Sequence, residues 1–108
     1  MTGLSTHVLD ATAGTPAVGM RVRLFHSEQG EISTATTDGD GRIGEVIPGP
    51  VEPGVYRLSF DTESYFEATS TPSFYPEVSV SFTVTDPDAH YHVPLLLSPF
   101  AYSTYRGS

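Results

Sequence analysis

Histidine is the side chain best suited to proton transfer near neutral pH, and the chain has four of them. Two of these, His90 and His92, stand at alternate positions of one segment. The following Val93, Leu95 and Leu97 predict that this segment is a strand with its apolar face toward the core. Because side chains alternate across a strand, both imidazoles then project from the outer face. An ordinary surface histidine is the alternative interpretation of His92.

His7 and Arg42 are the next two side chains that could do chemistry. The alternation around His7 does not indicate which face of its strand is the core, so a structural, surface or catalytic role stays open. Arg42 follows the Asp/Gly turn at residues 38–41, and a guanidinium at such a loop-to-strand junction is placed to contact a ligand. A salt bridge to Asp38 or Asp40 is the alternative.

Composition excludes several classes of function. Thirteen Asp and Glu against five Arg and no Lys give a net charge of −8, so we expect no nucleic-acid or membrane-surface partner. The absence of Lys and Cys removes Schiff-base chemistry, thiolate zinc sites and a cysteine nucleophile. A histidine pair alone does not make a metal site, so no metal is expected. No bilayer-spanning run or signal peptide is visible, which favours a cytoplasmic location.

Short alternating runs separated by Gly and Pro predict an all-β sandwich in one domain, residues 1–108. A short helix is expected over 62–68, capped by Asp61, and a turn at Pro48-Gly49-Pro50. Edge strands in a chain of this size often pair between subunits, so an oligomer is expected. The strands are expected over 4–9, 20–25, 34–37, 42–47, 54–60, 78–84, 90–97 and 102–105.

Segments along the whole chain resemble the 5-hydroxyisourate hydrolases of the transthyretin-like family. The Tyr-Arg-Gly-Ser segment at 105–108 is the most specific of them, because in this family it marks the hydrolases rather than the hormone-carrying transthyretins. The other matching segments are LSTHVLD at 4–10, GTPA at 14–17, TDGDGR at 37–42, DTESYF at 61–66 and HYHVPLLLSP at 90–99.

The resemblance implies a sandwich of two four-stranded sheets with one short helix. It implies a homotetramer, a dimer of dimers, whose active sites line a channel between the dimers. The implied reaction is hydrolysis of 5-hydroxyisourate to 2-oxo-4-hydroxy-4-carboxy-5-ureidoimidazoline in urate degradation, with no metal or organic cofactor.

The resemblance also implies which residues form the site. His7 and His92 would activate water and transfer protons, with acid and base unassigned between them. Arg42 would hold the substrate and stabilise the oxyanion, and Ser108 would have a positional role rather than that of a nucleophile. The implied catalytic residues are His7, Arg42, His92 and Ser108, and the implied substrate-binding residues are Arg42, Tyr105, Arg106, Gly107 and Ser108.

Two other functions are alternatives to hydrolysis. A non-catalytic carrier of a small aromatic ligand would use the same channel, but a passive apolar channel does not need two histidines, an arginine and the last four residues. An extracellular adhesion or accessory sandwich would be indicated by a signal peptide, a linker or a cell-wall anchor. None of these is visible in the sequence.

Overall fold

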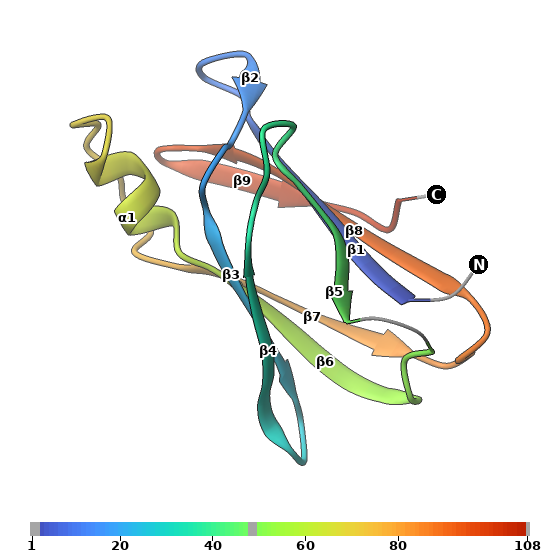
Figure 1. Ribbon diagram of the computed structural model, residues 1–108. Helices are drawn as coiled ribbons and strands as arrows, with labels where there is room; N and C mark the ends of the chain where they lie inside the picture. Colours follow the sequence, from blue (N-terminus) through green and yellow to red (C-terminus); the bar gives the residue numbers. More distant parts are fainter. Residues whose placement is uncertain (1–2, 48–49, 108) are drawn as a thin grey trace.

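The computed structural model describes residues 3–47 and 50–107, and Figure 1 shows their arrangement. The all-β sandwich with one short helix is confirmed. Within the described residues the elements are β1 (Gly3–Asp10), β2 (Thr15–Pro16), β3 (Arg21–His26), β4 (Gly30–Thr36), β5 (Arg42–Ile47), β6 (Gly54–Phe60), α1 (Thr62–Glu67), β7 (Val78–Val84), β8 (His90–Ser98) and β9 (Ala101–Thr104).

The strands form two sheets that pack face to face (Figure 1). One sheet has the order β4-β3-β6-β7, and every neighbouring pair in it is antiparallel. The other has the order β2-β1-β8-β9, with β5 also paired to β1. Its central pair, β1 and β8, is parallel over the whole length of β1. The two-residue β2 makes this a five-stranded sheet where four strands were expected.

The core lies between the sheets and is built from alternate residues of each strand. In β8 the expected apolar set is buried, with Val93, Leu95 and Leu97 at most 7% exposed. In β6 the buried apolar side chains are Tyr56, Leu58 and Phe60, which belong to the same core cluster from the other sheet. The residues between these positions on β8 therefore point out of the sandwich, as the alternation predicts.

The helix begins as predicted and ends one residue early. The Asp61 carboxylate accepts a hydrogen bond from the Ser64 N–H at 3.2 Å, and Phe66 is buried against the core. The Tyr65 hydroxyl donates to Oδ2 of Asp10 at 2.8 Å, which ties α1 to the end of β1. Burial, followed by this bond to Asp10, raises the pKa of Tyr65 to about 12. Among the described residues, no helix is long and apolar enough to cross a membrane.

Three local predictions differ from the structure. The strand expected from residue 34 begins at Gly30, because β4 is a sheet edge whose half-exposed side chains lack an apolar alternation. The two-residue β2 had no pattern from which to predict it. The last strand ends at Thr104 rather than at residue 105. The turn expected at Pro48-Gly49 lies outside the described residues.

Gly41 allows the turn that precedes β5 to pack closely against β1. Its φ of +74° is in the left-handed region, which glycine adopts without steric cost. A Cβ atom at this position would lie 2.5 Å from the carbonyl oxygen of Val8 and 2.9 Å from Cβ of Pro16. The Gly41 carbonyl also accepts the Val8 N–H at 2.8 Å. The turn can approach β1 this closely only if residue 41 has no side chain.

We expect Gly41→Ala to lower the free energy of unfolding by about 1–3 kcal/mol or more, because it adds backbone strain and a steric clash. Gly39→Ala, two residues earlier in the same turn, is the matched control, since a Cβ there meets nothing within 4 Å. It should change stability by no more than about 0.5 kcal/mol. Urea unfolding of the three proteins measures both values, and equal stability of the two variants would contradict this account of the turn.

Candidate active site

The parallel pairing of β1 and β8 brings the predicted histidines to one surface. Leu4, Thr6 and Val8 are fully buried, so the intervening His7 points away from the core. This answers the question that the alternation around His7 leaves open. In the register of the pair, His7 lies opposite Pro94, and the other outward residues of β8 are His90 and His92. All three histidines therefore project from the outer face of the same sheet.

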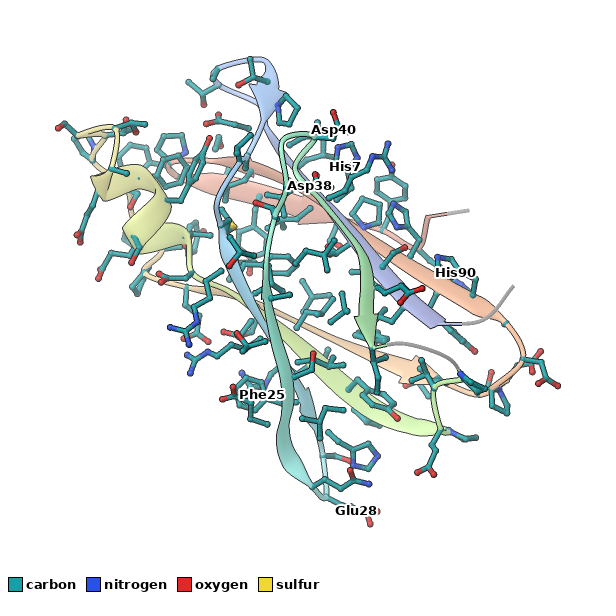
Figure 2. All side chains as sticks on the ribbon, viewed as in Figure 1. His7, Phe25, Glu28, Asp38, Asp40 and His90 are labelled. Atoms are coloured by element: carbon teal, nitrogen blue, oxygen red, sulfur yellow. The ribbon has the colours of Figure 1, made fainter. Side chains whose placement is uncertain are left out.

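Arg42 joins them from the other side of β1. In the antiparallel pairing of β5 with β1, Arg42 is the direct partner of His7, so both side chains stand on the outer face. The Asp38 carboxylate accepts the backbone N–H groups of Arg42 at 3.0 Å and Asp40 at 2.9 Å. These bonds hold the turn closed. Figure 2 shows His7 beside it.

The salt bridge of Arg42 to Asp38 or Asp40, which was the alternative role, is not present in the described part of the chain. The ion pairs there join Arg23 to Glu31 and Arg57 to Glu77, both on the other sheet. The pKa of Asp38 is held below its ordinary value, first because its carboxylate accepts the Arg42 N–H and then the Asp40 N–H. The Arg42 guanidinium remains exposed to solvent.

The segment after β9 returns to His92. The Gly107 N–H donates to the His92 carbonyl at 2.8 Å, an isolated bridge beyond the end of β9. A Cβ atom on Gly107 would lie 2.5 Å from Cδ2 of His92 and 3.2 Å from Cγ of Pro94. The backbone therefore passes directly over the imidazole, at a distance that only glycine allows.

Two other residues of this segment were predicted to bind substrate. The Arg106 guanidinium lies over the Tyr91 ring, 4.6 Å from its centroid. Tyr91 is a buried residue of β8 that lies between His90 and His92 in the chain. The Tyr105 ring is 60% exposed. Ser108 lies outside the described residues.

Ser5 and His90 lie next to His92, although sequence reasoning assigned them no role. The Ser5 hydroxyl lies 2.7 Å from Nδ1 of His92 and 2.8 Å from Nε2 of His90. Ser5 lies two residues before His7, so the alternation of a strand places both side chains on the same face. This pattern could have been used to predict the position of Ser5. The missing information was that β1 and β8, more than 80 residues apart, lie side by side in parallel.

The environment of His92 favours its neutral form. Its pKa is lowered, first by burial and then by the positive charges of Arg42, His7 and His90. A neutral imidazole keeps one nitrogen free to accept a proton, which is what water activation requires. Across the described ranges, no group of three or more His, Cys, Asp or Glu side chains is arranged to hold a metal ion.

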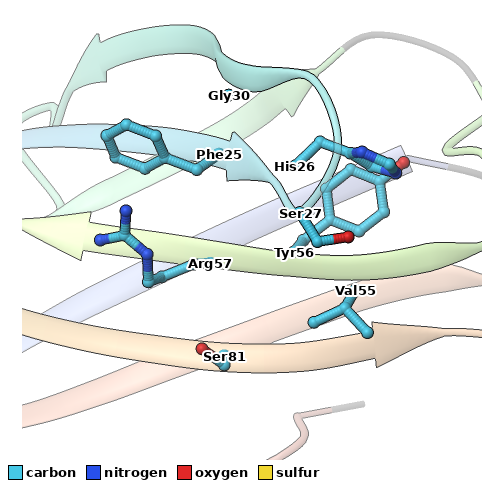
Figure 3. Close-up of a pocket in the computed structure, with 8 residues that line it drawn as sticks. All are labelled: Phe25, His26, Ser27, Gly30, Val55, Tyr56, Arg57 and Ser81. Atoms are coloured by element: carbon cyan, nitrogen blue, oxygen red, sulfur yellow. The ribbon is translucent and has the colours of Figure 1, made fainter.

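A cavity lies on the opposite sheet. It has a volume of about 310 Å³ beside the β3–β4 hairpin, where Phe25, His26, Tyr56 and Arg57 are among the lining residues (Figure 3). None of the predicted site residues lines it. The histidines and Arg42 instead stand on the outer surface of a sheet, where a partner surface would be needed to enclose a ligand.

Comparison with known proteins shows that nearly the whole chain is similar to 5-hydroxyisourate hydrolases and to a transthyretin. A 5-hydroxyisourate hydrolase of Mus musculus is 48% identical over 111 residues, covering 97% of this chain and 94% of that protein. The structure of Klebsiella pneumoniae 5-hydroxyisourate hydrolase matches with a TM-score of 0.89 and 35% identity, covering 97% and 98% of the two chains. Transthyretin from Sparus aurata matches with a TM-score of 0.87 and 34% identity over 99% and 97%.

The family model described as the HIUase/Transthyretin family matches residues 4–107. This range includes His7, Arg42, His90 and His92 on β1, β5 and β8. The resemblance of the sequence motifs is thereby confirmed. The chain belongs to the HIUase/Transthyretin family.

Proposed function

We propose that this chain, acting as one domain, hydrolyses 5-hydroxyisourate to 2-oxo-4-hydroxy-4-carboxy-5-ureidoimidazoline, a step of urate degradation. The observation that carries the proposal is the group formed by His7, Arg42 and His92, which three adjacent strands present on one surface. The similar proteins of Mus musculus and Klebsiella pneumoniae bear the name of this activity. The reaction needs no metal or organic cofactor.

The two histidines supply the proton transfers. One imidazole takes a proton from water, whose oxygen bonds to the ring carbonyl carbon. The carbon–nitrogen bond of the six-membered ring then breaks, and the other imidazole returns a proton to the leaving nitrogen. His92 is suited to remain neutral at the start of this cycle, because burial and neighbouring positive charge lower its pKa. Either histidine can be the base, since the two sites are electrostatically coupled.

Arg42 supplies the positive charge for the transition state. Water addition places negative charge on the carbonyl oxygen, and a fixed guanidinium next to that position stabilises it. Its backbone is held by Asp38 and by the pairing with His7, while its side chain remains free of carboxylate partners among the described residues. Such a group can also hold a planar, urate-like ring through its fork of N–H donors.

Residues 105–108 form the wall of the proposed site. Gly107 supports this role because its backbone packs on the His92 ring. Arg106 anchors the segment on Tyr91, and we assign it with Gly107 to substrate binding. We assign Tyr105 and Ser108 to binding and orienting the substrate, with Ser108 next in the chain to the glycine over His92.

A non-catalytic carrier of an aromatic ligand is the second candidate, and the similarity to Sparus aurata transthyretin favours it. The polar group on β1, β5 and β8 favours hydrolysis, because a carrier has no need of paired histidines beside an arginine. Turnover separates the two functions. The absence of nucleic-acid and membrane partners and the cytoplasmic location stay predictions, and cell fractionation tests the location.

We also propose that the chain forms a homotetramer, a dimer of dimers, in which a second dimer covers the outer face of β1 and β8. The open position of the histidines supports this, as does β9, a sheet edge whose four residues are all exposed. Light scattering on the purified protein should give four times the 11.6 kDa chain mass. A monomer that turns over substrate at full rate would contradict the assembly but not the activity.

Arg42→Gln should lower kcat/KM for 5-hydroxyisourate by about 10²–10³-fold, the typical cost of removing one oxyanion-stabilising donor. The measurement is the ultraviolet decay of freshly made substrate, corrected for the spontaneous rate. Arg57→Gln is the matched control, because Arg57 lies on β6 in the other sheet and pairs with Glu77. It should keep the wild-type rate. Equal losses in both variants would point to a general effect of charge and contradict the role of Arg42.

A further inference from the structure

One hydroxyl connects two histidines behind the proposed site. Ser5 is 8% exposed, and its Oγ lies 2.7 Å from Nδ1 of His92 and 2.8 Å from Nε2 of His90. The backbone register explains the geometry, because Ser5 is the direct partner of His92 in the parallel ladder and His90 is two residues away. The three side chains thus form a continuous line on the outer face.

A serine hydroxyl has one proton to donate, so it cannot donate to both nitrogens. When both histidines are neutral, one of them donates its N–H to Oγ and the other accepts the O–H. If His92 donates from Nδ1, its Nε2 is bare and can accept a proton. If His90 donates from Nε2, His92 instead carries its proton on Nε2. The hydrogen bonds of Ser5 therefore link the tautomer of His92 to that of His90.

We propose that Ser5 and His90 form a proton relay behind His92, with Ser5 as the positioning residue; this rests on the proposed function. Nε2 of His92 takes the proton from water as the water oxygen bonds to the substrate. The Nδ1 proton of His92 then passes to Oγ of Ser5, whose own proton passes to Nε2 of His90. His92 ends neutral with its proton on Nε2, and the positive charge ends on His90.

The positive charges around His92 favour transfer of the proton from His92 toward His90. Arg42 on β5, His7 on β1 and His90 on β8 all disfavour a positive charge on His92. Arg42 pairs with His7, which lies opposite Pro94, whereas His90 lies opposite Gly3 at the far end of the ladder. Figure 2 shows this separation of His7 and His90 along the strands. Moving the proton to His90 carries it away from the guanidinium while the transition state uses that guanidinium.

The direct test is ¹⁵N NMR of the imidazoles in the resting protein, which distinguishes protonation at Nδ1 from protonation at Nε2 without any turnover. Wild type should show coupled tautomers at His90 and His92. Ser5→Ala should uncouple them and Ser5→Thr, which keeps the hydroxyl, should restore the coupling. Ser81→Ala, on β7 of the other sheet, is the matched control and should leave both signals as in wild type. Unchanged His92 signals in Ser5→Ala would overturn the relay.

Kinetics give the second readout. Ser5→Ala should reduce kcat on the order of 10–100-fold with little change in KM, by analogy with the loss of a hydrogen bond that orients a metal-binding histidine. His90→Gln can still hydrogen bond to Ser5 but carries no charge. Burial, Arg42 and His7 lower the pKa of His92 more than the charge of His90 does, so the acidic limb of kcat/KM should move to higher pH by a small amount in this variant.

The outcomes separate the two proposals. If wild type does not turn over 5-hydroxyisourate but Ser5→Ala changes the His92 tautomer, the proposed function fails and the hydrogen-bond line stands. If wild type turns over and both Ser5→Ala and His90→Gln keep the wild-type kcat and pH profile, the relay is wrong and the function stands. Should Ser5→Ala not fold, the pH profile of His90→Gln decides the matter.

Discussion

Parallel pairing of β1 with β8 is the constraint on which the rest of the site depends. It places the second-to-last strand beside the first and fixes which residues share the outer face. A slip of one residue would turn His92 into the core and bring Val93 to the surface. The register is held from the inside, where Leu4, Val8 and Leu95 are fully buried and the Thr6 hydroxyl donates to the Val93 carbonyl at 2.6 Å. The chemistry on one face thus relies on apolar packing on the other.

The chain as a whole is acidic, whereas the proposed site carries positive charge. The net charge of −8 would repel an anionic, urate-like ring, so a binding site needs positive charge concentrated at one place. Three of the five arginines lie on the other sheet, at positions 21, 23 and 57. The Arg106 guanidinium stacks on the Tyr91 ring. Arg42 is left beside the histidines. In the proposed function Arg42 attracts the substrate, and its charge is the second cause, after burial, of the lowered pKa of His92.

Much of this arrangement could be predicted from the sequence, and the limits have physical reasons. The outward position of His92 follows from the apolar alternation of β8, and the cap of α1 follows from Asp61. The orientation of His7 did not follow, because Thr6 is buried and polar while Leu9 is apolar and only half-buried. The part played by Ser5 depends on the pairing of distant strands, which no local pattern encodes. The stacking of Arg106 on Tyr91 also requires the fold to be known.

In the proposed function, the outer face of β1, β5 and β8 performs hydrolysis. The most direct test follows the ultraviolet decay of freshly prepared 5-hydroxyisourate with wild-type protein and His92→Ala side by side. Wild type should speed the decay well above the spontaneous rate, and His92→Ala should lose about 10²–10⁴-fold, the usual contribution of a general acid or base. A wild-type rate no faster than the spontaneous decay, or a folded His92→Ala as active as wild type, would contradict the account.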